Sequence, residues 1–115
     1  MTEEEENKMD MFDKRFQIWL EGAQKIVDDY YRTAFPRIYF EHKKILIVDR
    51  GRRYIKMSLI QGGRQKAVFA FIDMTNGDVL KAATWRRPAK KARGNIFNQD
   101  DGLGCVDPYG IKYLR

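Results

Sequence analysis

The chain has 115 residues, 43% of them hydrophobic, which suits a single globular domain with a modest core. Its formal net charge is +6, and because the first ten residues hold five acids against one lysine, the other 105 residues carry +10. A field of that sign favours anionic partners, whether nucleic acid, phosphorylated small molecules or an anionic membrane surface.

Cysteine usage and hydropathy indicate where the protein works. The single cysteine, Cys105, excludes an intramolecular disulfide and fits a reducing compartment. The N-terminus is acidic where a secretory signal would be cationic and then apolar, and no run approaches the ~20 apolar residues of a membrane span. We therefore expect a cytoplasmic protein with no membrane partner.

The first predicted element is an amphipathic helix over residues 10–35, preceded by an acidic leader at residues 1–9. Apolar side chains recur at spacings of three and four, which places them on one helical face: Met9, Phe12, Phe16, Trp19, Ala23, Ile26 and Tyr30. Pro36 disfavours helical backbone at the residue before it and should end the helix. Two interpretations of the aromatic face stay open. It packs entirely on the chain's own sheet, or part of it packs on the same helix of a second copy, giving a homodimer or higher homo-oligomer.

The pattern then changes to four short β-rich runs, which predict an antiparallel sheet over residues 44–83. The runs are KILIVD, RYIKMSLI, KAVFAFID and DVLKAA, and turn residues such as Asn76 and Gly77 separate them. Connections this short make neighbouring strands antiparallel. We expect an α+β fold within one domain, residues 1–115: an N-terminal amphipathic helix followed by an antiparallel β-meander and a long ordered C-terminal loop segment.

Residues 84–115 form that last segment, a basic loop followed by the C-terminus. Glycine and proline interrupt it and no hydrophobic period is visible, which is typical of a long loop. Its many apolar residues, among them Trp85 and Ile96, argue against disorder. The sequence therefore predicts an ordered segment that wraps over the sheet.

Residue types suited to catalysis or metal binding are sparse. The one histidine, His42, and the one cysteine have no metal-ligand spacing, so we expect no metal, no cofactor and no catalytic residue. Aspartates in or near predicted turns are favoured there for their backbone hydrogen bonds, and acid–base work by a pair of them is the alternative. They are Asp73, Asp78, Asp100, Asp101 and Asp107.

The stretch TWRRPAKKARGNIF, residues 84–97, is the candidate binding site. Trp85 could stack on a base, Asn95 has the donor and acceptor that match an adenine edge, and Gly94 lets a ligand approach the backbone. Four cations there suit phosphate oxygens: Arg86, Arg87, Lys90 and Arg93. The alternative is a solvated loop in which Trp85 and Ile96 serve as core anchors.

A longer pattern carries a family resemblance over about the last two thirds of the chain. RYIK, then AVFAFIDMTNGDVLKAATWRRPAKKARGNIF, then DPYGIKYLR, with W-x-x-P-A-K-x-x-R-G-N as its specific core, resembles the phage family called Thoeris anti-defence one. The resemblance implies an N-terminal helix followed by antiparallel strands, assembly through the helices, and sequestration without cleavage of cyclic ADP-ribose signals made by TIR-domain enzymes. The chain would then be a nucleotide-binding sponge and not an enzyme.

The same resemblance implies roles for particular residues. An aromatic side chain and an asparagine about ten residues later would hold the base, and these are Trp85 and Asn95. Basic residues near the C-terminus would hold the phosphates, and these are Lys112 and Arg115. Lys112 supplies a point charge where the family has a bidentate arginine.

A second class of function uses the same residues. A phage single-stranded nucleic-acid-binding protein would stack bases on Trp85, Tyr54, Phe69 and Tyr113 while the cations follow the phosphate backbone. Polymer binding that displaces several counterions weakens steeply with salt, whereas a ligand with two charges in an enclosed pocket responds less. A small phage structural protein or host-protein inhibitor is a third possibility, and it would bind neither anion.

Overall fold

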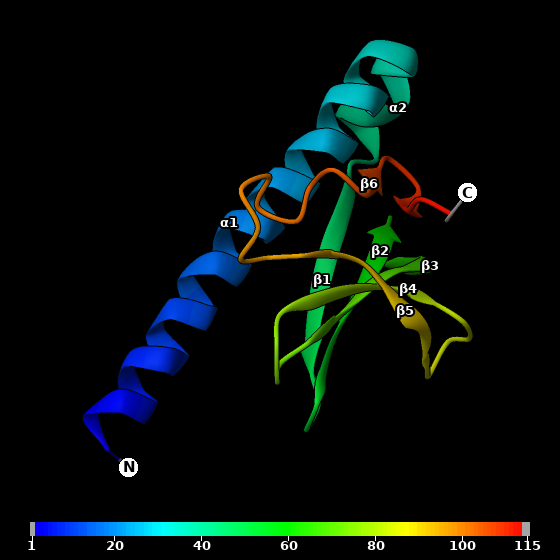
Figure 1. The fold of residues 1–115 in the computed structure, drawn as a ribbon. Helices are drawn as coiled ribbons and strands as arrows, with labels where there is room; N and C mark the ends of the chain where they lie inside the picture. Colours follow the sequence, from blue (N-terminus) through cyan, green and yellow to red (C-terminus); the bar gives the residue numbers. More distant parts are fainter. Residues whose placement is uncertain (1, 114–115) are drawn as a thin grey trace.

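A long helix, α1 (Glu3–Ala34), dominates the computed structural model, which describes residues 2–113, with side chains described for residues 2, 3 and 10–113. The predicted start at residue 10 is wrong, because the acidic leader is itself helical from Glu3. Glutamate, lysine and methionine are good helix formers, and acids at an N-terminus interact favourably with the helix dipole. The N-terminal end of α1 projects beyond the strands (Figure 1).

Proline ends one helix and begins the next. α1 stops at Ala34, as Pro36 predicted, and the short helix α2 (Pro36–Glu41) follows with the proline in its first turn, where the missing N–H costs nothing. None of the α2 residues is buried. Within the described chain, neither helix is long and apolar enough to cross a membrane.

Five antiparallel strands form one sheet in sequence order. They are β1 (Lys44–Arg50), β2 (Tyr54–Gln61), β3 (Arg64–Asp73), β4 (Asp78–Ala82) and β5 (Pro88–Asn95). The predicted meander is confirmed, with Gly77 in the β3–β4 turn at a φ of 83°. The fifth strand lies in the stretch predicted to be a basic loop. That prediction is wrong for residues 88–95, because PAKKARGN lacks apolar alternation and becomes a strand by pairing with β4.

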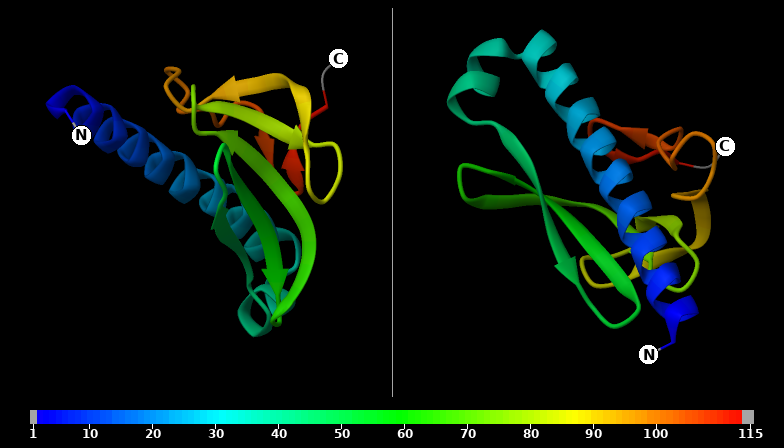
Figure 2. Two further views of the ribbon diagram at one scale, coloured as in Figure 1. Left: turned by 90° about the horizontal axis from the view of Figure 1, so that it is seen from below. Right: turned by 90° about the vertical axis from the view of Figure 1, so that its left-hand side faces the viewer.

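The rest of the C-terminal segment is ordered, as expected. After β5 the chain makes turns and ends in a small hairpin of β6 (Val106–Asp107) and β7 (Gly110–Ile111). The segment lies beside α1 on the same side of the sheet (Figure 2). Its apolar anchors Ile96, Val106 and Ile111 are all buried.

The core lies between α1 and the sheet. The helical face supplies Phe16, Trp19, Ala23 and Val27, each at most 3% exposed, and Phe12, Ile26 and Tyr30 pack half-buried against the same cluster. The strands contribute Ile55, Met57, Leu59, Phe69, Ala70, Ile72 and Val79. The aromatic face is therefore covered by the chain's own sheet, and it no longer supplies a reason to expect a second copy. The side chain of Met9 lies outside the described residues.

Two side chains of α1 hold the C-terminal segment. The Trp19 indole donates to the Gly102 carbonyl at 3.2 Å in a buried position. Arg15 donates to the carbonyls of Ile96 and Asn98, each at 2.8 Å, and pairs with Asp101 at 3.1 Å. Buried and half-buried bonds of this kind fix the backbone of an irregular segment that no ladder supports.

One side chain occupies part of the free edge of β1. The Gln24 amide donates to the Lys44 carbonyl at 3.0 Å, and its oxygen accepts the Leu46 N–H at 2.9 Å, so the side chain imitates a neighbouring strand. Leu46 is buried toward α1, and on the opposite face of the strand Ile45 and Ile47 are 47% and 45% exposed. Occupying the backbone groups of an edge strand blocks pairing with another chain.

Substitution of Gln24 should measure this edge contact. We expect Gln24→Ala to lower the free energy of unfolding by roughly 1–2 kcal/mol, because two backbone groups of β1 lose their partner. Gln17→Ala is the matched control, since the Gln17 amide bonds only to exposed Glu21. Denaturant titrations of both variants test this, and equal losses would contradict the role of Gln24.

Candidate functional site

Positive charge is left unpaired in the second half of the chain. Seven ion pairs join described side chains, and every cation in them lies between residues 15 and 53. No lysine or arginine from residue 56 to residue 112 pairs with a described carboxylate. These unpaired cations are Lys56, Arg64, Lys66, Lys81, Arg86, Arg87, Lys90, Lys91, Arg93 and Lys112.

Two aspartates near the end of the chain accept backbone N–H groups. Asp100 accepts those of Gly102 and Gly104 at 2.9 and 3.1 Å, and Asp107 accepts that of Tyr109 at 2.8 Å. The turn-forming role predicted from sequence is confirmed for these two, whereas the carboxylates of Asp78 and Asp101 bond to the side chains of Asn95 and Arg15. Within the described residues no three His, Cys, Asp or Glu side chains gather as a metal-ligand set.

Asp73 also holds a turn, although it is 3% exposed. Its carboxylate accepts the Thr75 N–H and hydroxyl at 2.9 and 2.6 Å, and Arg53 donates to it from 3.2 Å. Burial raises the pKa of Asp73, but the hydrogen bonds from Thr75 and Arg53 outweigh burial and hold that pKa below its ordinary value. Asp73 is therefore ionised and structural, which does not suit a general acid.

The exposed turn between β4 and β5 carries Trp85. The Thr84 hydroxyl accepts the N–H groups of Arg86 and Arg87 at 3.2 and 3.1 Å, which fixes the turn. Trp85 is 55% exposed, and the Lys56 ammonium lies 5.9 Å from its ring centroid. Trp85 is therefore a surface ring beside cations, and the core-anchor interpretation is wrong for this residue.

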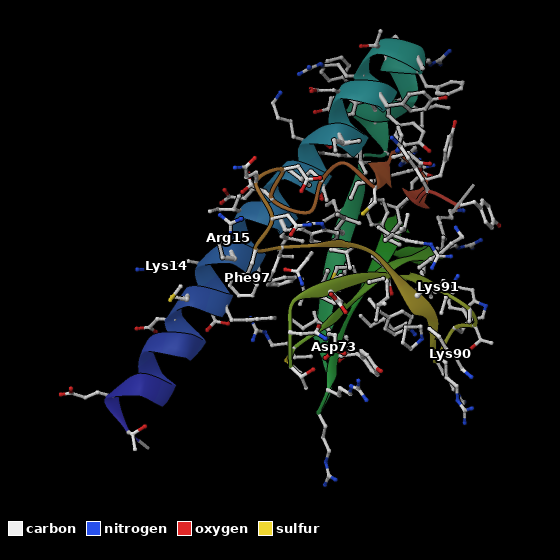
Figure 3. The ribbon with its side chains drawn as sticks, in the orientation of Figure 1. Lys14, Arg15, Asp73, Lys90, Lys91 and Phe97 are labelled. Carbon is white, nitrogen blue, oxygen red and sulfur yellow. The ribbon has the colours of Figure 1, made fainter. Side chains whose placement is uncertain are left out.

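A groove of about 350 Å³ runs beside this turn, between β3 and the end of β4. Trp85 and Lys66 line it together with small side chains. We give the name tip cluster to the lining residues Lys66 and Trp85, the next turn residues Arg86 and Arg87, and Lys56 beside the Trp85 ring. Lys90 follows on β5, where Lys90 and Lys91 point to opposite sides of the strand (Figure 3).

The predicted roles of Asn95 and Gly94 meet competing structural demands. The Asn95 amide donates to the Asn76 carbonyl and to Asp78 at 2.9 and 3.0 Å, and its oxygen accepts the Phe97 N–H at 2.8 Å. An adenine edge would have to displace these bonds. A Cβ on Gly94 would lie 3.0 Å from the Cys105 sulfur, so a side chain there would crowd the thiol.

Arg93 and Lys112 lie away from the tip, beside the C-terminal segment. Burial raises the pKa of the Cys105 thiol, and the positive charges of Lys112 and Arg93 oppose part of that rise. Arg93 donates to the Lys91 carbonyl, and Lys112 donates to the Gly104 carbonyl at 3.4 Å. We name Lys81, Arg93 and Lys112 the tail cluster, since Lys81 donates to the Ile111 carbonyl in the same segment. Arg115 lies outside the described residues.

Of the four rings considered for nucleic acid, the structure removes one. Phe69 is 1% exposed within the core and cannot stack on a base. Tyr54 is half-buried on the open face of the sheet, and Tyr113 is 80% exposed beside the tail cluster. Sequence reasoning identified Trp85 and its cations, but it missed Lys56 and Lys66, which come from other strands.

The pH dependence of stability should report Asp73. The pKa of Asp73 is lower in the folded state than in the unfolded state. The carboxylate therefore contributes fully to the free energy of unfolding above its unfolded-state pKa, near 4, and this contribution is lost as the pH falls through its folded-state pKa. We expect Asp73→Asn to lower the free energy of unfolding at pH 7 by roughly 2 kcal/mol. The variant should also lose less of that free energy than the wild type between pH 7 and pH 3, because the titrating carboxylate is gone. Denaturant titrations at pH 7 and 3 measure both. Asp13→Asn is the control, because Asp13 forms an exposed ion pair with Arg50. If this variant reduces the loss of stability in acid as much as Asp73→Asn does, the role given to Asp73 is contradicted.

Asn95→Ala should separate a structural role from a ligand contact. Because three hydrogen bonds are lost, we expect a loss of roughly 1–3 kcal/mol in the free energy of unfolding, with ligand affinity of the folded protein unchanged. The matched control is Asn98→Ala, since the Asn98 amide forms no hydrogen bond with a described residue. A stable Asn95→Ala protein that fails to bind nucleotide would restore the base-reading role.

Known proteins give the chain a family but no function. No curated protein matches it, and no solved structure matches it. A family model matches residues 4–113, nearly the whole chain. The chain belongs to that family, which is described as a family of unknown function (DUF7717).

Proposed function

We propose that the chain is a nucleotide-binding protein that holds a phosphate-bearing ligand at the tip cluster. The observation that carries this proposal is the exposed Trp85 ring, which has the Lys56 ammonium 5.9 Å from its centroid and is followed in the turn by Arg86 and Arg87; none of these cations has a described carboxylate partner. An exposed indole offers a face for a base, and neighbouring arginines offer paired donors to phosphate oxygens.

The resemblance to the phage sponge family supplies the identity of the ligand. On this proposal the protein sequesters a cyclic ADP-ribose-type signal in the host cytoplasm without cleaving it, and so blocks TIR-based immunity. Trp85 stacks on the base, while Arg86 and Arg87 take the diphosphate. Asn95 is left out of the site, because its amide is already bonded.

The groove at the tip is open to solvent, and this affects whether one copy of the chain can hold a ligand alone. A ligand there would keep part of its surface in water, and tight capture needs most of a ligand's surface buried. A homodimer or higher homo-oligomer in which a second copy closes the groove is therefore part of this proposal. Nanomolar capture would require about 12 kcal/mol of binding free energy, which an open surface supplies with difficulty.

A single-stranded nucleic acid is the second candidate, and a specific observation favours it. Unpaired cations lie at the tip, on both sides of β5 and in the tail cluster, so they extend over more surface than two phosphates can reach. A phosphate backbone that passes over several strands could contact all of them. Trp85 would then be one stacking position along that path.

A titration decides between the two ligands. The purified protein is titrated with a TIR-generated cyclic ADP-ribose isomer and with a thymidine oligonucleotide, each at low and high salt, and the bound nucleotide is released by heating and identified by chromatography. Capture of the intact cyclic nucleotide supports the sponge. Oligonucleotide binding that weakens steeply with salt, without capture of the cyclic nucleotide, supports the second candidate.

Trp85→Ala tests the site under either ligand. We expect binding to weaken by roughly 10- to 100-fold, the effect of losing one base-stacking ring. Phe40→Ala is the matched control, because it removes an exposed ring on α2 that belongs to neither the tip cluster nor the tail cluster. If both variants bind like the wild type, or if neither nucleotide binds the wild type, the tip cluster is not a nucleotide site.

A further inference from the structure

A second concave site lies where α1 gives way to α2, in the part of the molecule seen at the top of Figure 1. It is a pocket of about 330 Å³. Five separate parts of the chain line it: the end of α1, the residue between the helices, α2, the paired ends of β1 and β2, and the β6–β7 turn. The lining residues are Tyr31, Phe35, Ile38, Lys44, Gln61 and Tyr109.

The walls of this pocket are aromatic and apolar, yet they face solvent. Phe35 and Ile38 are each 46% exposed, and Tyr109 is 62% exposed. The Tyr31 and Phe35 rings lie 6.1 Å apart at an angle of 34°. Exposed rings that converge from distant parts of a chain are typical of a ligand pocket with flat, apolar walls.

Tyr109 is held in position by its neighbour. Its hydroxyl lies 2.6 Å from the hydroxyl of Tyr30, and the two ring centroids are 5.5 Å apart. This hydrogen bond raises the pKa of Tyr109 to about 12, so the phenol stays neutral at physiological pH. A neutral phenol does not repel an anion.

Lys44 is the charged group of the pocket, and it has no counterion. Its ammonium donates to the Tyr31 hydroxyl at 2.8 Å and lies 4.0 Å from the centroid of the same ring, so both of its described partners are neutral. The neighbouring Lys43, in contrast, pairs with Asp28 at 3.4 Å. A half-buried ammonium that lacks a carboxylate gains more from an anionic ligand than a solvated one does.

We propose that this pocket binds a small planar organic anion, one or two fused aromatic rings that carry a carboxylate or sulfonate. The rings would lie against Phe35 and Tyr109, and the anionic group would accept a hydrogen bond from Lys44. A volume of about 330 Å³ lies at the small end of ligand pockets and suits such a molecule better than a polymer. The site shares no residue with the tip or tail cluster, so the proposal stands independently of the proposed function.

The test uses 2-naphthoate as the probe and follows the amide signals of the isotope-labelled full chain by NMR. We expect saturable shifts centred on residues 31–44 and on Tyr109, and about tenfold weaker binding by Lys44→Gln, which loses the charge-assisted bond. Lys44→Arg keeps the charge and should retain binding. Lys43→Gln is the matched control, because it removes the adjacent charge outside the pocket and should leave the affinity within about twofold of the wild type.

The uncharged analogue 2-naphthamide separates charge from apolar contact, and it should bind clearly more weakly than 2-naphthoate. Equal binding of the two probes, equal effects of Lys43→Gln and Lys44→Gln, or the absence of saturation at millimolar probe would each overturn the proposal. Shifts centred on the tip or tail cluster would do the same, since they would show attraction to surface cations. Thermal unfolding of each variant verifies that the folded state is being compared.

Discussion

The packing of Trp19 is the interaction on which the rest of the structure depends. This side chain is 0% exposed, and its ring contacts Phe16 within α1 and Phe69 in the sheet at centroid distances of 6.2 and 6.5 Å. Its indole N–H is bonded to Gly102, so a single residue joins the helix, the sheet and the irregular C-terminal segment. Small domains bury little surface, and a segment that forms no hydrogen-bond ladder with a neighbouring strand must be held by such side-chain contacts. The irregular segment that follows β5 is thereby fixed against the helix.

Much of this arrangement could be predicted from the sequence, and the errors have physical reasons. The helical face and the strands β1 to β4 were predictable because burial on one side imposes a period of 3.6 or 2 on the sequence. Residues 88–95 have no such period, since their strand is held by pairing with β4 and by the Asn95 amide. Trp85 and its cations could be recognised by residue type. The hydrogen bonds of Asn95 could not be predicted, because an asparagine amide can bond to neighbouring residues of a hairpin or to an adenine edge equally well. Only the positions of Asn76 and Asp78 in the structure decide between these two roles.

Charge is distributed unevenly along the chain, and the fold preserves that asymmetry in space. Acids of α1 pair with four cations, Lys25, Arg32, Lys43 and Arg50, whereas Asp100 and Asp107 are bonded to the backbone and Asp101 to Arg15 of the helix. The β2–β5 surface therefore keeps cations that have no described carboxylate partner, and its positive potential is lowered at Lys56 by Asp49, the residue opposite on β1. Potentials of this kind raise the encounter rate of anions from a distance, while the stacking ring and the groove act only on contact. The Lys44 pocket combines the same two elements at a smaller scale.

The Gln24 contact has a consequence for how the protein behaves when it is concentrated. A five-stranded open sheet has two edges through which identical molecules could join into filaments, and a side chain already satisfies part of the first one. Growth at the second edge would bring together strands that carry Lys90, Lys91 and Arg93, and like charges opposed across a sheet repel. On the proposed function, the positive charge that β5 offers to an anionic ligand also opposes growth at this edge, so a bound polyanion that neutralises it would be expected to bring the molecules closer together.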